Sequence, residues 1–162
     1  MSETKQTFDT PEDRIPHYEA INNLGLLALS IRMWAKGKGF EDHVEGLRES
    51  VKRDRSIGKT ERDALLANLE NLFTGQQVSL IVSEIGGEFV EATRKPEPDD
   101  KLPQWPGELV EWADSIVRHL HLGSRLADKY GGEVGYDVLN HVLRDVLCNN
   151  EGRPHKHGGK SF

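Results

Sequence analysis

The sequence predicts an all-α fold, a helical bundle of about four to five helices. Three observations carry this prediction. Apolar residues recur at the three- and four-residue spacing of a helix, as in Ile21, Leu24, Leu27 and Ile31. Glycines or prolines follow the apolar stretches and mark helix ends. No segment shows the apolar–polar alternation of a half-buried strand, and no internal repeat is present.

The first helix is expected over residues 18–36, because Gly37 and Gly39 follow its last apolar residue. Residues 41–59 are highly charged with a thin apolar stripe, which predicts a short peripheral helix or a loop. Thr60 is the expected N-cap of the next helix, which Thr74-Gly75 either interrupts or only weakens. It continues to residue 94, where a proline-rich loop begins. The last helices are expected at 108–130 and 133–148.

The organisation expected is a flexible segment at 1–16, one helical domain at 17–148 and a basic, glycine-rich tail at 149–162. The 162 residues suffice for one domain with a core. A net charge of -6 argues against a nucleic-acid polymer as partner, because such binding needs a basic surface. No apolar run is long enough to span a membrane. The single Cys148 cannot form an internal disulfide, which favours a cytoplasmic location.

Five carboxylates form the most informative pattern of the chain. On an α-helix, at about 100° per residue, Glu84, Glu88 and Glu91 lie within about 60° of one another. Glu111 and Asp114 repeat the arrangement on the next helix. Like charges at this spacing cost about 0.2–0.5 kcal/mol each on an exposed helix, so an inward-facing set requires a compensating cation. A hard divalent ion such as Mg2+ suits these oxygens. Ordinary solvent-facing pairs, of Glu91 with Lys95 and of Asp114 with Arg118, are the alternative.

The order of these motifs resembles that of the MazG-like all-α nucleotide pyrophosphohydrolases, in particular the small phage and bacterial type. Glu88-x-x-Glu91 is followed after nineteen residues by Glu111-x-x-Asp114. Residues 21–24 and 34–40 resemble the opening helix of that family, and residues 150–160 resemble its closing N-x-x-R-P-x-x-H-G-x-K segment. Ile85 stands where relatives often carry a further Glu, and Glu84, one residue earlier, is the candidate to replace it.

The resemblance implies Mg2+-dependent hydrolysis of a nucleoside triphosphate to a monophosphate and pyrophosphate, with Mn2+ as an alternative metal. It also implies a homo-oligomer, a dimer or tetramer. The catalytic candidates are Glu88, Glu91, Glu111 and Asp114, and the metal candidates are these four with Glu84. The basic substrate-binding candidates are Lys38, Arg94, Arg118, Arg153, Lys156 and Lys160.

Trp34 is a candidate for stacking on the base or a simple core residue, and Asn150 is a candidate for base or sugar recognition. A non-catalytic nucleotide-binding or helical interaction protein is the main alternative to the enzyme. A di-iron bundle is disfavoured because the chain contains no Glu-x-x-His pair.

Overall fold

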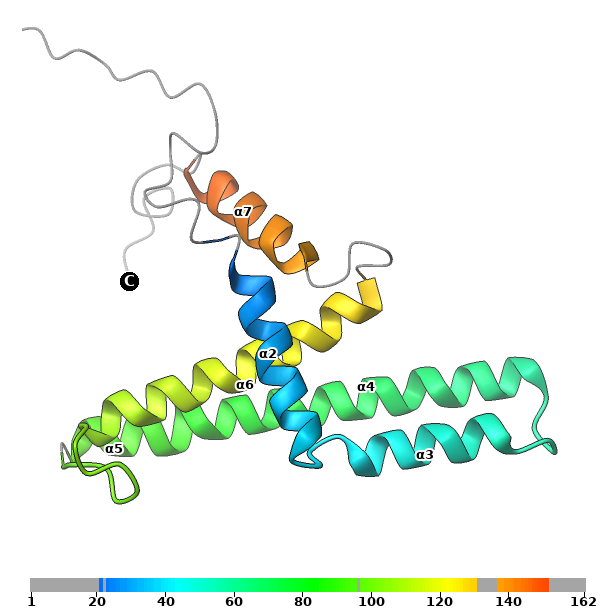
Figure 1. Ribbon diagram of the computed structural model, residues 1–162, viewed down its shortest axis with the longest axis horizontal. Coiled ribbons are helices and arrows are strands. Elements are labelled where there is room, and N and C mark those ends of the chain that lie inside the picture. Colours follow the sequence, from blue (N-terminus) through cyan, green and yellow to red (C-terminus); the bar gives the residue numbers. More distant parts are fainter. Residues whose placement is uncertain (1–20, 22, 96, 131–136, 152–162) are drawn as a thin grey trace, which may run out of the picture. The chain divides into compact units, whose positions relative to one another are not determined.

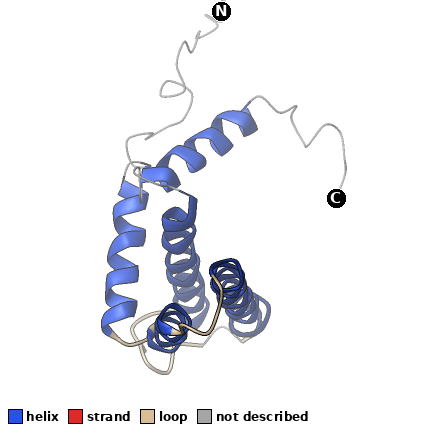
Figure 2. Ribbon diagram, turned by 90° about the vertical axis from the view of Figure 1, so that its right-hand side faces the viewer, coloured by secondary structure: helices blue, strands red, loops and turns tan. Residues whose placement is uncertain are grey.

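The computed structural model describes residues 21, 23–95, 97–130 and 137–151, and Figure 2 shows the described chain as helices joined by loops. The helices are α2 (Leu24–Gly37), α3 (Asp42–Arg53), α4 (Lys59–Ser83), the π-helix η2 (Glu84–Phe89), α5 (Val90–Arg94), α6 (Gly107–Tyr130) and α7 (Asp137–Glu151). Because α4, η2 and α5 follow one another without a break, these seven elements form five continuous helical segments in the described chain. Within the described ranges, β pairing is limited to one isolated bridge between Pro98 and Pro106. The all-α prediction is confirmed.

The backbone divides into two compact units. The larger unit is Ala28–Arg125 and holds α3, α4, η2, α5 and most of α2 and α6. The smaller unit is made of Met1–Leu27 and Leu126–Phe162. In its described part, the Gly25 amide at the start of α2 donates a hydrogen bond to Asn140 Oδ1 of α7 at 2.9 Å.

Within the larger unit, α4 is the central element along which its neighbours lie. Figure 1 shows α3 and α6 beside α4. Glu70, in the middle of α4, contacts Arg125 late in α6, whereas Glu84, directly after the end of α4, contacts Arg118 earlier in α6. The two helices therefore run in opposite directions, which brings the end of α4 close to the first half of α6.

A left-handed turn connects α2 to α3 within this unit. Gly39 has φ of 80°, a conformation that glycine adopts freely and other residues rarely adopt. A Cβ there would lie 2.9 Å from Asp42 Oδ2. The amides of Gly39 and Phe40 donate to the carbonyls of Lys36 and Ala35, so they satisfy the end of the helix. The turn leads directly to Glu41, one of the most buried side chains.

Several expected boundaries differ from the observed ones. The expected N-cap at Thr60 is wrong, because Gly58 is the N-cap and α4 begins at Lys59. Arg62 explains the earlier start, since its guanidinium donates to the carbonyls of Asp54 and Ile57 and so fastens the preceding turn to the helix. Thr74-Gly75 lies within α4 without interrupting it. The charged segment 41–59 contains the helix α3.

No described helix is both long and apolar enough to cross a bilayer.

Candidate functional site

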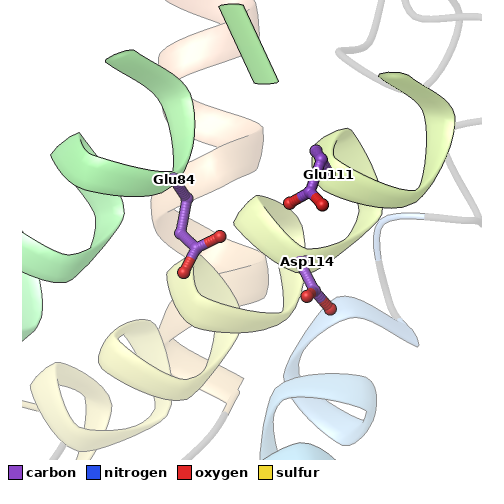
Figure 3. Close-up of side chains that lie close together, drawn as sticks. All are labelled: Glu84, Glu111 and Asp114. Atoms are coloured by element: carbon purple, nitrogen blue, oxygen red, sulfur yellow. The ribbon is translucent and has the colours of Figure 1, made fainter. Parts of the chain in front are cut away.

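Three carboxylates from two helices converge in the larger unit. Oxygen atoms of Glu84, Glu111 and Asp114 all lie within 4.8 Å of one another. Figure 3 shows Glu84 on one helix facing Glu111 and Asp114, which lie one turn apart on α6. Glu84 is buried, Glu111 is partly buried and Asp114 is exposed, so the carboxylate cluster formed by these three residues opens to solvent on the Asp114 side.

The π-helix η2 determines which glutamates reach this cluster. It spans Glu84–Phe89 and contains Gly86-Gly87, whose low helix propensity makes a regular α-helical turn less favourable. Short π-helical turns of this kind are frequently found at functional sites. The wider turn changes the register after Glu84, so the inward-facing α-helical stripe expected for Glu84, Glu88 and Glu91 is not formed. Glu84 is buried, whereas Glu88 and Glu91 are exposed.

A hydrogen-bonded loop fixes α6 relative to η2 and α5. The Asp99 side chain accepts hydrogen bonds from the amides of Lys101 and Leu102, and the Asp99 amide donates to Trp105 O. Gly107, the first residue of α6, donates to Glu97 O at 2.9 Å. A Cβ at Gly107 would lie 3.3 Å from that same oxygen, so glycine permits the close approach. This loop sets the position from which Glu111 faces Glu84.

The cluster carries unbalanced negative charge. Burial raises the pKa of Glu111, and the nearby charges of Glu88, Asp114 and Glu84 raise it further. Glu111 Oε2 is buried and has no hydrogen-bond partner. Arg118 forms an ion pair with Glu84. Three carboxylates and one guanidinium leave two formal negative charges, which is the charge that one divalent cation neutralises.

Glu88 and Glu91 lie on the neighbouring surface rather than in the cluster. Together with Glu111 they line a hollow of about 460 Å3, to which the loop after α5 also contributes. Glu91 accepts a hydrogen bond from Lys95 at 2.8 Å, and both side chains are largely exposed. The Lys95 hydrogen bond lowers the pKa of Glu91. Glu91 is thus engaged in the solvent-facing pair that the sequence offered as the alternative.

A cavity of about 310 Å3 adjoins the carboxylate cluster. Asp114 and Arg118 both line this cavity. Asp114 is a member of the cluster, and Arg118 forms the ion pair with Glu84 of the cluster. The rest of its wall comes from α2, α4, α6 and the turn after α2. These residues are Ile31, Trp34, Ala35, Phe40, Phe73, Gln76, Gln77, Leu80, Val117 and His121. Trp34 is therefore in the cavity wall, where its ring contacts that of Phe40 at 5.7 Å between centroids.

The other substrate-binding candidates are not brought together in the described chain. Lys38 and Arg94 are exposed and line neither the cavity nor the hollow beside Glu91. The side chain of Asn150 and the residues Arg153, Lys156 and Lys160 lie outside the described part.

Sequence reasoning missed a buried charge network centred on Glu41. This side chain is only 1% exposed. It accepts hydrogen bonds from His121 Nε2 at 2.9 Å and Arg125 Nη1 at 2.6 Å, and Arg32 Nε lies 3.5 Å away. Burial raises its pKa, but the His121 hydrogen bond and the charges of Arg125, Arg32 and Lys36 outweigh burial and hold the pKa at about 2. Glu41 is therefore ionised at neutral pH, and His121 Nε2 carries the proton that it donates.

Arg125 extends the Glu41 network to α4. Its Nη2 donates to both carboxylate oxygens of Glu70 at 3.0 Å, and its guanidinium lies 4.2 Å from the centre of the Phe73 ring. The network thus ties the α2–α3 turn, α4 and α6 together around the cavity wall. The position of Glu41 directly after Gly39-Phe40 was a weak sequence signal, because its two hydrogen-bond donors, His121 and Arg125, are 80 and 84 residues away.

The chain matches no known family model, and it matches neither a curated protein nor a solved structure.

Proposed function

We propose that this protein is a Mg2+-dependent nucleoside triphosphate pyrophosphohydrolase, which releases a nucleoside monophosphate and pyrophosphate. The observation that carries the proposal is the convergence of Glu84, Glu111 and Asp114 beside a cavity. Carboxylates that face one another at this distance are costly unless a cation compensates them, above all where one of them, Glu84, is buried. The resemblance to MazG-like enzymes supports the same reaction and indicates which bond is cleaved, the one between the α- and β-phosphates.

The residues present fit a hard divalent ion. Glu111 Oε2 is a buried oxygen without a hydrogen-bond partner, and the cluster offers only carboxylate oxygens, which Mg2+ prefers and Mn2+ accepts. Glu84, Glu111 and Asp114 would hold the ion, with the exposed Asp114 side open to water and phosphate. When bound, Mg2+ would supply positive charge to the triphosphate oxygens and lower the pKa of a water ligand.

The protein's own side chains would position the phosphates and receive the proton. Arg118 uses one nitrogen for Glu84, and a guanidinium has five N–H donors, so donors remain for phosphate oxygens. The water oxygen forms a bond to the α-phosphorus, the bond between this phosphorus and the bridging oxygen breaks, and pyrophosphate leaves. Glu88 lies outside the cluster and lines, together with Glu111, the hollow beside it. A carboxylate that does not hold the ion can take the proton that the water releases, and we assign this role to Glu88.

Self-association into a dimer or tetramer belongs to this proposal. Trp112 and Ile116, one helical turn apart on α6, are 51% and 38% exposed. Large apolar side chains that share an exposed helix face favour burial against another surface.

A non-catalytic nucleotide-binding or helical interaction protein is the second candidate. The ion pair of Glu84 with Arg118 favours it, because this pair neutralises the most buried carboxylate of the cluster without any metal.

Pyrophosphate release separates the two candidates. Purified protein is incubated with each common ribo- and deoxyribonucleoside triphosphate, with Mg2+ or with a chelator. We expect Mg2+-dependent pyrophosphate release that Glu84→Gln abolishes. Glu108→Gln, an exposed glutamate in the first turn of α6, is the matched control and should retain activity. Absence of pyrophosphate release from every nucleotide would favour the non-catalytic protein.

A further inference from the structure

The cavity between α2, α4 and α6 combines features that suit a flat, uncharged ring. Three aromatic side chains line it: Trp34, Phe40 and Phe73. Trp34 and Phe40 are 53% and 62% exposed, so their faces are accessible, whereas Phe73 is buried in the wall. Stacking of a nucleobase on an aromatic side chain contributes about 1–3 kcal/mol.

Gln77 gives this cavity a polar group that a ligand can reach. The residue is only 8% exposed, and it lines the cavity. No described residue hydrogen-bonds to its side-chain amide. The Gln77 amide atoms are not among the fully buried polar atoms that lack a partner, so solvent or a ligand can reach them. Because the amide both donates and accepts, it suits a ring edge in the cavity that offers an acceptor beside a donor.

The charged residues of the cavity wall define the other end of the ligand. Asp114 and Arg118 line the cavity and reach the carboxylate cluster, so one molecule can extend from the cavity to the cluster. The other residues that line the cavity are apolar or uncharged, apart from His121. The hydrogen bond from His121 Nε2–H to Glu41 holds the His121 ring in place. The volume of about 310 Å3 lies at the small end of ligand pockets, which suits a base with its sugar and leaves the phosphates outside.

We infer that this cavity binds the nucleoside part of the substrate, with the base against Trp34 and its hydrogen-bonding edge read by Gln77. The inference rests on the proposed function, because the carboxylate cluster is taken as the phosphate end. It identifies the ligand as a molecule with a base, rather than a simple polyphosphate or a sugar phosphate. In this site Gln77 determines which base is bound and takes no part in the chemical step.

The test measures binding of the four common nucleoside monophosphates and of ribose 5-phosphate, which lacks the base, by calorimetry with Mg2+ present. Gln77→Met keeps the side-chain volume and removes the amide. We expect the best-binding monophosphate to bind more tightly than ribose 5-phosphate and to lose about tenfold in affinity in Gln77→Met, whereas ribose 5-phosphate is unaffected. Asn71→Leu, which alters an exposed amide of α4 outside the cavity, is the matched control and should bind normally.

Two further measurements separate a binding role from a structural one. Because no described residue hydrogen-bonds to the Gln77 amide, Gln77→Met should retain the thermal stability of the wild type. The monophosphate should also quench tryptophan fluorescence, and Trp34→Phe should remove this quenching, because Trp34 is the tryptophan that lines the cavity.

Equal affinity for the monophosphates in wild type and Gln77→Met would overturn the inference. So would binding of every monophosphate no tighter than that of ribose 5-phosphate. Neither measurement requires turnover. Base-dependent binding without pyrophosphate release would therefore refute the hydrolase while supporting the nucleoside site, and pyrophosphate release without any effect of Gln77 would do the reverse.

Discussion

Replacement of Glu41 by Gln should destabilise the fold by about 3 kcal/mol at pH 7. The carboxylate is almost fully buried, and its pKa is lowered from 4.5 to about 2. Each pKa unit corresponds to about 1.4 kcal/mol of differential stabilisation of the ionised form. The shift of about 2.5 units therefore gives about 3 kcal/mol, within the range known for the loss of one partner from a buried ion pair.

The pH dependence of this loss follows from the direction of the shift. A carboxylate whose folded-state pKa is lowered stabilises the protein above its unfolded-state pKa, and this contribution falls as the pH drops through the folded-state value. The stability difference between wild type and Glu41→Gln should thus be full at pH 7 and fall to about 1 kcal/mol at pH 3. Urea unfolding followed by circular dichroism at several pH values measures it.

Glu45→Gln provides the control for this experiment. Glu45 is 39% exposed and lies 3.6 Å from Arg48 and 3.8 Å from Arg125, so it contacts the same network from the surface. Exposed pairs of this kind contribute about 0–1 kcal/mol. If Glu41→Gln costs no more than Glu45→Gln, or if its cost does not change between pH 7 and pH 3, the assignment of Glu41 as the buried ionised centre is refuted.

Three further predictions concern the site and the assembly. Glu88→Gln and Asp114→Asn should each lower kcat at saturating Mg2+ by at least a hundredfold with unchanged helical circular dichroism, and near-normal turnover in both would exclude the site. Glu111→Gln should raise the melting temperature of the metal-free protein, because the fold raises the pKa of this carboxyl and so disfavours its ionised form. The substitution also relieves about 0.2–0.5 kcal/mol of repulsion from Asp114 alone. A lower melting temperature would contradict this reasoning. Sedimentation at micromolar concentration should show a dimer or larger oligomer that Trp112→Ser shifts toward monomer, whereas a wild-type monomer would refute the proposed association.

The helices were predictable because their signals are local. The glycines after α2 predicted where that helix ends, since helix ends depend on neighbours in the sequence. Its start was not predicted, because α2 begins at Leu24 rather than at residue 18. The start of α4 was misplaced because Arg62 fastens the preceding turn, which is a contact that residue propensities do not contain.

The site was predictable in composition but not in geometry. Sequence spacing identified Glu84, Glu111 and Asp114 as candidates, yet it treated Glu88 and Glu91 as members of the same α-helical stripe. The π-helix at Gly86-Gly87 changes that register, and spacing rules assume a regular helix. Glu41 was missed for another reason. It is the first residue of the strongly charged segment 41–59, which was expected to be peripheral, whereas its buried partners His121 and Arg125 come from a distant helix.

Hydrolysis in 18O-labelled water, with products identified by phosphorus NMR, tests the central claim most directly. Attack of water on the α-phosphorus predicts equal amounts of monophosphate and pyrophosphate, with the label in the monophosphate alone, and only when Mg2+ is present. Glu84→Gln should give neither product. Formation of a nucleoside diphosphate and inorganic phosphate, or 18O in the pyrophosphate, would contradict the proposed reaction.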